Sequence, residues 1–169
     1  MLLTARKARK LALACAVAAM AAAASCAPPV DLVTNLQVLD VSTGWFDAGI
    51  VNGQNKLVPT ITFKLKNLSD QKLTVLQANV LFHRVSDPNV EWGAGFLSVT
   101  GSEGLGPGAE TKPLTVKSNL GYTGSDQTRQ EMLQNKAFID ATVQVFAKYG
   151  SVQWVKKGEY PVERRLMTN

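Results

Sequence analysis

The sequence predicts an all-β protein with one domain, an antiparallel sandwich of about seven strands and one short crossover helix. Apolar and polar residues alternate in short runs, as they do in strands that bury one face, and clusters of Gly, Pro, Asn, Asp and Ser separate these runs. The part from Cys26 to Asn169 has 144 residues, close to the commonest size of a single domain.

Three strands are expected in the first half of this domain, over 36–46, 60–66 and 73–85. Period-two alternation gives the second and third a buried face made of Ile61, Phe63, Leu65, Leu76, Ala78, Val80 and Phe82. The polar segment 67–71 between them predicts a turn, because Asn, Ser and Asp side chains bond nearby backbone groups.

The next segments predict two strands and the helix. Asp87-Pro88-Asn89 is expected to break the pattern before a strand over 92–100, in which Gly93 and Gly95 indicate a bulge or an edge. The glycine-rich segment 101–108 is expected to be a loop that leads into a strand over 111–118. Thr128 and Glu131 have the spacing of a capping box, which predicts a short helix through about Asn135.

The last hairpin is predicted from the alternation over 139–149, with Gly150-Ser151 as its two-residue loop. This register pairs Ala147 with Trp154 in the core and places Phe146 beside Val155 on the outer face. The chain then closes with an edge strand over 159–166, since Pro161 is tolerated only at an edge or at a strand start.

Seven or so strands with this spacing resemble an immunoglobulin- or fibronectin-III-like sandwich. Over residues 57–120, a strand ending in Lys66-Asn67, a polar turn, a long apolar strand and a Gly-Pro-Gly loop resemble bacterial extracytoplasmic modules of the FxLYD type, although the F-x-L-Y-D string itself is absent. The resemblance implies a fold and no activity, because such folds carry many functions.

Residues 1–25 are expected to be a secretory signal peptide that takes no part in the fold. Four basic residues precede an uninterrupted apolar run over 11–24, and small residues follow it. The run has about 14 residues, whereas a bilayer span needs roughly 20. Residues 26–35 are then expected to form an acylated cysteine with its tether, and residues 36–169 the sandwich domain.

Ala23-Ala24-Ser25-Cys26 resembles the lipobox of bacterial lipoproteins, although the usual Leu is missing at Ala23. The resemblance implies that Cys26 is diacylated, for example with palmitate, and becomes the new N-terminus. Ala27, rather than Asp, then implies sorting to the outer membrane, facing the periplasm or the cell surface. The alternative is an ordinary signal peptide that leaves Cys26 as a free thiol. Cys26 is the only cysteine beyond the signal, so no intramolecular disulfide is expected.

The formal net charge of +5 does not indicate a nucleic-acid partner. Four basic residues lie in the first ten positions, and from Cys26 onward 14 basic residues face 13 acidic ones. No basic stripe with interleaved aromatic residues is visible. The basic pairs Lys156-Lys157 and Arg164-Arg165 are expected to be solvated strand ends, or alternatively contacts for acidic lipid head groups.

The sequence offers little catalytic chemistry. His83 is the only histidine, its alternation places it on the solvent face, and no Gly-x-Ser-x-Gly motif accompanies it. One histidine and one cysteine do not supply a zinc site, and no calcium loop is present. The loop over 104–108 lacks the Lys-Ser/Thr of a phosphate-binding loop. We therefore expect no catalytic residue, no metal and no cofactor.

Recognition by a surface remains. The candidate partner residues are Phe146 and Val155 on the outer face, with Trp92 and Tyr122 on the segments 86–95 and 121–124. The alternative is that other segments cover them. The edge over 159–166 is a further candidate, which would accept a partner strand.

These observations favour a non-enzymatic, lipid-anchored protein of the cell envelope that binds another envelope component or serves as its accessory subunit. The alternative is a soluble secreted carrier or ligand-binding domain without a lipid, whose site lies between the sheets or under the loops of 101–125.

Overall fold

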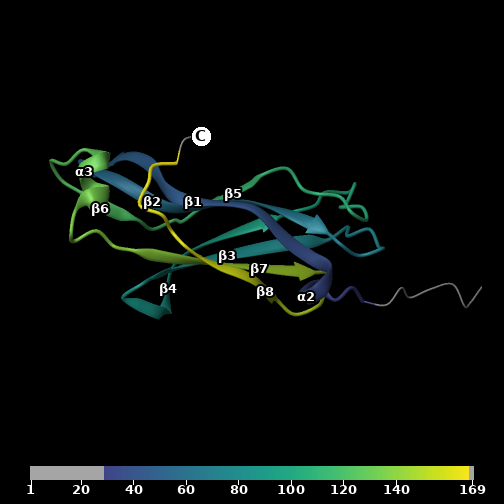
Figure 1. Cartoon of the computed structure of the whole chain (residues 1–169). Helices are drawn as coiled ribbons and strands as arrows, with labels where there is room; N and C mark the ends of the chain where they lie inside the picture. Colours follow the sequence, from purple (N-terminus) through teal and green to yellow (C-terminus); the bar gives the residue numbers. More distant parts are fainter. Residues whose placement is uncertain (1–28, 168–169) are drawn as a thin grey trace, which may run out of the picture.

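Residues 29–167 are described by the computed structural model, in which two antiparallel sheets pack face to face (Figure 1). One sheet has the order β1-β2-β5, with β6 also paired to β2, and the other has the order β4-β3-β7-β8. The elements are α2 (Leu32–Asn35), β1 (Leu36–Val51), β2 (Gln54–Asn67), β3 (Leu76–Arg84), β4 (Asp87–Ser98), β5 (Leu114–Lys117), β6 (Tyr122–Gly124), α3 (Arg129–Gln134), β7 (Ala141–Tyr149) and β8 (Val155–Pro161). This confirms the predicted all-β sandwich, and the distribution of strands is that of an immunoglobulin-like Greek key.

The core lies between β2 of one sheet and β3 and β7 of the other. Every apolar residue that the alternation assigned to the inner faces of the second and third predicted strands is fully buried: Ile61, Phe63, Leu65, Leu76, Ala78, Val80 and Phe82. Burying each of the larger of these side chains contributes about 1.5–3 kcal/mol. The prediction holds here because a strand buried on one face leaves a direct trace in the sequence.

The first strand is longer than the predicted 36–46. β1 continues to Val51 and turns into β2 at Asn52 and Gly53, whose φ angles are 53° and 78°. Two consecutive residues with positive φ define the turn that matches the twist of a hairpin, and Asn-Gly is its preferred sequence.

The β3–β4 connection differs from the predicted break at Asp87-Pro88-Asn89. Val85 and Ser86 make the turn, and Asp87 already begins β4. β4 is an edge strand, as its glycines indicated, and these glycines also leave room for side chains of the other sheet and the segment after it. A Cβ at Gly93 would collide with the Ser118 side chain, and one at Gly95 with Val116 of β5.

The predicted register of the last hairpin is wrong. β7 and β8 are joined by residues 150–154 rather than by two residues, and Ala147 pairs with Val155. Gly150 has a φ of 58° and donates its N–H to the Val75 carbonyl at 3.0 Å, which carries the loop away from β7. Val155 consequently faces the core, whereas Trp154 is exposed.

The C-terminal segment also departs from the predicted edge strand over 159–166. β8 ends at Pro161, and the chain crosses to the other sheet, where Trp45 of β1 donates to the Arg165 carbonyl and accepts from Met167 N–H, both at 2.8 Å. This part of the edge is therefore already paired with β1.

The short helix is confirmed. α3 lies between β6 and β7, where the chain passes from one sheet to the other. The Thr128 hydroxyl accepts from Glu131 N–H at 3.3 Å, and the Glu131 carboxylate accepts from Thr128 N–H at 2.7 Å. These two bonds form the expected capping box, and the hydrogen bonds that the Glu131 carboxylate accepts from Thr128, first of all from its backbone N–H, lower the pKa of Glu131.

The folded part begins before residue 36. Val30 and Leu32 are buried in the core, and Lys157 of β8 donates to the carbonyls of Leu32 and Val33 at 2.6 and 3.0 Å. These residues were predicted to belong to the tether, which their packing shortens. The predicted signal peptide and Cys26 lie outside the described residues. Neither helix in the described part of the chain has the length and apolarity needed to cross a bilayer.

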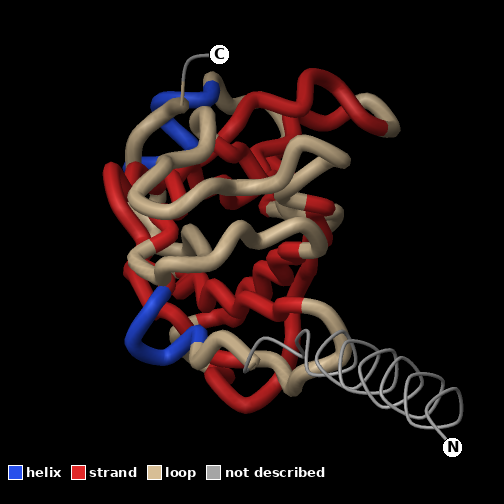
Figure 2. Tube along the Cα trace, turned by 90° about the vertical axis from the view of Figure 1, so that its right-hand side faces the viewer, coloured by secondary structure: helices blue, strands red, loops and turns tan. Residues whose placement is uncertain are grey.

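The sandwich has two ends, which we call the α2 pole and the α3 pole (Figures 1 and 2). The α2 pole comprises 29–35, 67–75, 99–113 and 150–154, and hydrogen bonds join Leu68 N–H to the Asn35 carbonyl and Leu105 N–H to the Leu73 carbonyl there, both at 2.8 Å. The α3 pole comprises 50–55, 84–91, 118–140 and 163–167. The described chain therefore enters at one pole and ends at the other.

Candidate functional site

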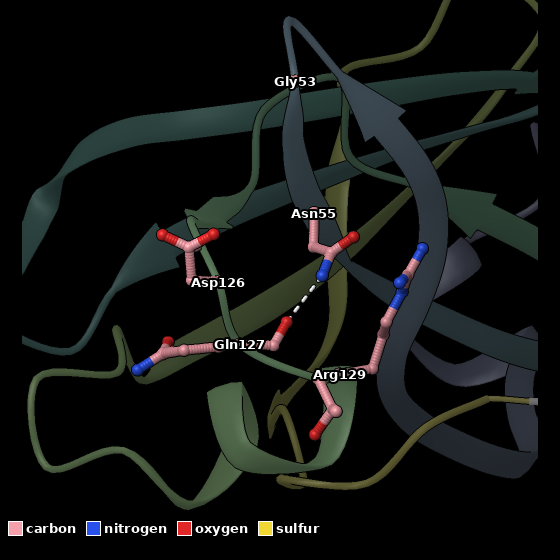
Figure 3. A pocket seen from close by; sticks show the side chains of 7 residues that line it. Gly53, Asn55, Asp126, Gln127 and Arg129 are labelled. Atoms are coloured by element: carbon pink, nitrogen blue, oxygen red, sulfur yellow. Dashed lines mark hydrogen bonds between the residues drawn. The ribbon is translucent and has the colours of Figure 1, made fainter.

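The α3 pole carries three of the hollows in the described surface, grouped around the helix and the C-terminal segment. The first, of about 390 Å³, lies between the β1–β2 hairpin and the segment before α3 (Figure 3). Asn55 of the hairpin donates to the Gln127 carbonyl at 2.5 Å, and Arg129 pairs with Asp47 of β1 at 2.9 Å. These bonds hold the helix start against the hairpin.

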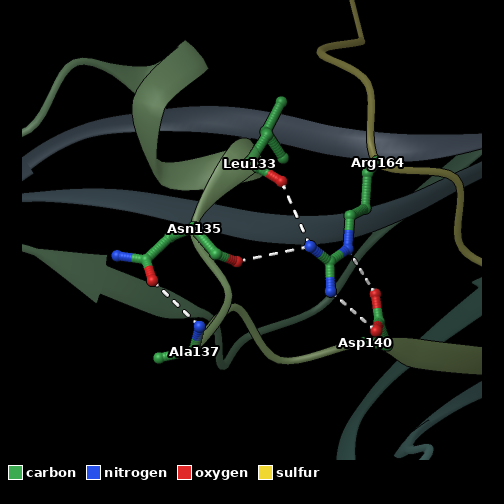
Figure 4. A network of polar contacts seen from close by, with 5 residues as sticks. All are labelled: Leu133, Asn135, Ala137, Asp140 and Arg164. Carbon is green, nitrogen blue, oxygen red and sulfur yellow. Dashed lines mark hydrogen bonds and ion pairs between the residues drawn. The ribbon is translucent and has the colours of Figure 1, made fainter.

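Arg164 is the centre of the polar contacts at this pole (Figure 4). Its guanidinium donates to both oxygens of Asp140, at 2.7 and 2.8 Å, and to the carbonyls of Leu133 and Asn135, at 3.4 and 3.3 Å. The hydrogen bonds from Arg164 lower the pKa of Asp140. One side chain thus connects the C-terminal segment, the end of α3 and the start of β7.

A second hollow of the pole, of about 430 Å³, is basic. Arg84, Lys136 and Phe138 line it together with Asp140, and the carboxylate of Asp140 is already engaged by Arg164. No ion pair of the described residues includes Arg84 or Lys136. This hollow therefore offers two cations whose charge is not neutralised by a direct partner.

Exposed apolar side chains surround these hollows. They are Ile50, Val51, Val85, Val90, Leu120 and Leu166. Val85 lines the basic hollow itself, and Leu166 lines a third hollow of about 380 Å³ beside Arg164 and Leu133. Cationic and apolar groups thus lie next to each other at the α3 pole.

Beneath the surface of this pole, four aromatic rings pack together, and two of them belong to predicted partner residues. Trp45 lies with ring centroids 4.5 Å from Phe138 and 6.2 Å from Trp92, and Tyr122 lies 4.8 Å from Phe138. Trp92 is 6% exposed and Tyr122 is half-buried against the core. The prediction that Trp92 is exposed for contact is wrong, because the Arg84 guanidinium lies 5.2 Å from its ring centroid and the ring packs inward.

The other two predicted partner residues are not brought together. Phe146 lies on the outer face of the β4-β3-β7-β8 sheet, opposite Asn79 of β3, and is half-buried. Val155 is paired with Ala147 and faces the core, because the hairpin loop is longer than predicted. On the same outer face, Phe96 of β4 contacts the Trp154 ring edge-on, with centroids 6.3 Å apart.

His83 is buried, contrary to its predicted place in solvent. It is 8% exposed, and its Nδ1 donates to the Val90 carbonyl at 3.1 Å across the bulged start of β4. Its Nε2 is buried without a hydrogen-bond partner. The ring is therefore held by the backbone of β4, and no hydroxyl group among residues 29–167 hydrogen-bonds it.

The remaining sequence motifs have structural places. The glycine-rich loop of 101–108 makes an antiparallel bridge between Leu105 and Leu73. Lys157 caps the carbonyls of α2, and burial lowers the pKa of its amine. Lys156 pairs with Glu159 at the surface. Within residues 29–167, no group of three His, Cys, Asp or Glu side chains is placed to hold a metal ion.

Sequence reasoning missed the arginine contacts of the α3 pole. Arg164 and Asp140 are 24 residues apart and meet where β7 begins and β8 ends, and no local sequence pattern indicates their ion pair. Asn52-Gly53, by contrast, is a strong signal for a β-hairpin, and it would have predicted the turn that borders the first hollow.

Comparisons with known proteins add no function. No protein-family model and no curated protein matches the chain. Among solved structures, the chain is similar to the X-ray structure of Northeast Structural Genomics Consortium target SoR45, with 12% sequence identity and a TM-score of 0.46, over 78% of this chain and 89% of that one. The function proposed below therefore rests on this chain's own residues.

Proposed function

We propose that the protein is a lipid-anchored, non-enzymatic component of the cell envelope, attached to the outer membrane through Cys26, that binds another envelope protein with its α3 pole. The observation that carries the proposal is the short separation along the chain between Cys26 and the first packed residue. Packing begins at Val30, so only Ala27, Pro28 and Pro29 separate the domain from Cys26.

The direction of the strands supports the use of the α3 pole. β2 alone has 14 residues, which span about 45 Å at roughly 3.3 Å per residue. An anchor attached at the α2 pole holds that end near the membrane and leaves the α3 pole facing away from it. A partner in the surrounding compartment meets the α3 pole first.

The chemistry of the α3 pole indicates the kind of partner. Arg84 and Lys136 supply cations, and Val85, Val90 and Leu166 supply exposed apolar contacts. Arginine beside apolar and aromatic groups is typical of protein interfaces. The complementary partner is a protein segment with acidic and apolar side chains.

The anchor is tested by Cys26→Ser in the full chain, with palmitate labelling and membrane fractionation. The proposal expects the labelled protein in the membrane fraction, and expects the variant to lose the label, to leave that fraction and to accumulate as precursor. If the variant is processed and distributed as the parent chain is, the soluble secreted alternative replaces the anchored one.

The partner surface is tested with a photo-crosslinking residue at Val85 in whole cells. Val75, at the α2 pole, is a matched control, because the two valines are 55% and 52% exposed. We expect a protein adduct from Val85 only, and at least a threefold smaller yield when Arg84→Glu is added, since reversing a cation in an interface repels an acidic partner. Equal adducts from both positions would contradict a partner at the α3 pole.

The absence of catalysis is tested on the purified protein with a panel of hydrolase substrates. We expect no turnover that depends on His83. An activity that His83→Ala abolishes, in a variant that keeps its β-sheet circular dichroism, would overturn the non-enzymatic proposal.

A further inference from the structure

Exposed apolar side chains gather at the α2 pole, where the described chain begins. They are Val33, Leu68, Val75, Val152 and Trp154, each between 38% and 64% exposed. They come from three separate segments that the fold brings to one end of the sandwich. Solvated loops rarely present such a set, so the surface points to a contact that removes it from water.

Hydrogen bonds fix these segments next to one another. Leu68 donates its N–H to the carbonyl of Asn35 at 2.8 Å, beside Val33. Gly150 donates to the carbonyl of Val75 at 3.0 Å, which sets the loop with Val152 and Trp154 against the β2–β3 turn. The apolar side chains therefore belong to one surface whose backbone is held in place.

Trp154 is the most distinctive of these residues. Its ring meets Phe96 edge-on at 6.3 Å, and Lys148 Nζ lies 5.8 Å from its centroid. Tryptophan with a neighbouring lysine is the combination that bilayer interfaces favour, since the ring lies at the head-group level and the ammonium reaches toward water. The other two tryptophans, Trp45 and Trp92, are buried.

The charge of the pole favours no ionic partner. Its segments, extended to include 148–149 and 155–157, contain five lysines and four carboxylates, and the pairs Lys66–Glu110 and Lys156–Glu159 flank it. A nearly neutral rim around exposed apolar side chains fits a zwitterionic lipid surface as well as an anionic one.

The short distance along the chain from Cys26 to the α2 pole indicates what lies against this pole. From Cys26 to Val30 there are four residue steps, which reach at most about 14 Å at roughly 3.6 Å per step. An acylated Cys26 therefore holds the α2 pole within about one head-group layer of the bilayer, far less than the length of the sandwich. We propose, on the basis of the proposed anchor, that the α2 pole rests on the membrane, with Trp154 and its apolar neighbours inserted among the lipid head groups.

The test uses the full acylated chain, purified and reconstituted in phosphatidylcholine vesicles with or without dibrominated phosphatidylcholine, which quenches nearby tryptophan. We expect the emission of Trp154 to be quenched. Trp154→Phe should lose the quenchable component and keep the emission of Trp45 and Trp92, which also shows that the fold is retained. As a matched control, Ile50→Trp in the Trp154→Phe background places an exposed tryptophan at the α3 pole, and it should not be quenched.

The outcomes separate this inference from the anchor. An acylated chain that floats with the vesicles but shows no quenching of Trp154 overturns the inference and leaves the anchor intact. A chain from cells whose Cys26 carries no acyl group contradicts the anchor, and quenching of Trp154 in that chain would still support contact of the α2 pole with lipid. A chain from cells that lacks the acyl group and shows neither flotation nor quenching contradicts both. Quenching that requires anionic lipid and disappears at high salt would overturn an apolar contact. Absent quenching together with a protein adduct from Val152 in cells would assign the pole to a protein partner.

Discussion

The two poles of the sandwich are closed by different kinds of interaction. At the α3 pole, aromatic rings pack inside and Arg164 ties three chain segments together on the surface. At the α2 pole, the loops are organised by a buried asparagine, Asn67, and Trp154 is partly exposed.

The tryptophans show what this difference means. Trp45 and Trp92 are buried and stabilise the α3 pole from within, whereas Trp154 packs edge-on against Phe96 and is 38% exposed. The same residue type is therefore structural at one pole and presented at the other. The following substitutions test whether the poles are separable in this way.

The largest effect is expected from Trp45→Ala. Its side chain is fully buried against Phe138 and Trp92, and truncation of such a residue leaves a cavity that costs about 3–5 kcal/mol. Trp154→Ala is the matched control and should cost about 1–2 kcal/mol, because its side chain is 38% exposed and loses only its contacts with Phe96 and Lys148. Urea unfolding followed by circular dichroism measures both. Similar costs for the two variants would contradict the distinction between the poles.

Asn67→Ala should be the most damaging polar substitution at the α2 pole. The side chain has no exposed surface, donates to the carbonyls of Gln71 and Leu105 at 2.8 and 3.0 Å, and accepts from Ser69. Removing it leaves several buried polar groups without hydrogen-bond partners, so we expect the free energy of unfolding in urea to fall by about 2–3 kcal/mol.

The control for this variant is Asn79→Ala, on the outer face of β3, which should cost less than about 0.5 kcal/mol. If Asn67→Ala were equally mild, the loops of the α2 pole would have to be held by their backbone bonds alone.

Arg164→Ala should loosen the α3 pole at a cost of about 1 kcal/mol, since the pair with Asp140 is partly exposed and screened by solvent. Hydrogen exchange should rise over 133–140. The pKa of Asp140 is lower in the folded chain than its unfolded value of about 3.9, so its contribution to stability is present above that pH and is lost as the pH falls further.

The difference between the parent chain and Arg164→Ala should therefore be constant near neutral pH and shrink below about pH 4. Lys156→Ala, which removes a surface pair with Glu159, is the control and should leave hydrogen exchange over 133–140 unchanged. An unchanged difference at low pH would mean that Arg164 acts through Leu133 and Asn135 rather than through Asp140.

The interior of the fold was predictable because burial on one face of a strand is a local property. Phe63 and Val80 are where their alternation places them, and the helix start was visible in Thr128 and Glu131. The β7–β8 register was not predictable from alternation, because the loop path depends on the bond from Gly150 to Val75, which is a contact between strands distant in sequence.

The candidate site was predicted even less completely. Trp92 of β4 and Tyr122 of β6 were predicted as partner residues because they are aromatic, but whether such a ring faces inward depends on the packing of Phe138 and Arg84 around it. A basic hollow assembled from Arg84 and Lys136 exists only after β3 and β7, which are distant in sequence, pair in one sheet.

The smallest effect is expected where the chain enters the α2 pole. Lys157 donates to the carbonyls of Leu32 and Val33, and Lys157→Met keeps an apolar stem while removing both bonds. We expect a loss of about 0.5–1 kcal/mol at neutral pH, with faster hydrogen exchange at the start of β1.

The pH dependence of this variant distinguishes burial from a simple loss of contact. Burial lowers the pKa of Lys157 below its unfolded value of about 10.4, so the unfolded chain binds the proton more tightly, and the contribution of Lys157 to stability rises with pH between the two values. Lys157→Met lacks this rise, so the gap between the parent chain and the variant should widen from pH 8 to about pH 10. Because Lys64, whose pKa Asp40 raises, is present in both chains, its effect cancels in this difference. A gap that narrows over this range would show that the electrostatic attraction between Lys157 and Asp31 outweighs the burial of the amine, and that the entry of the chain is held by charge rather than by packing.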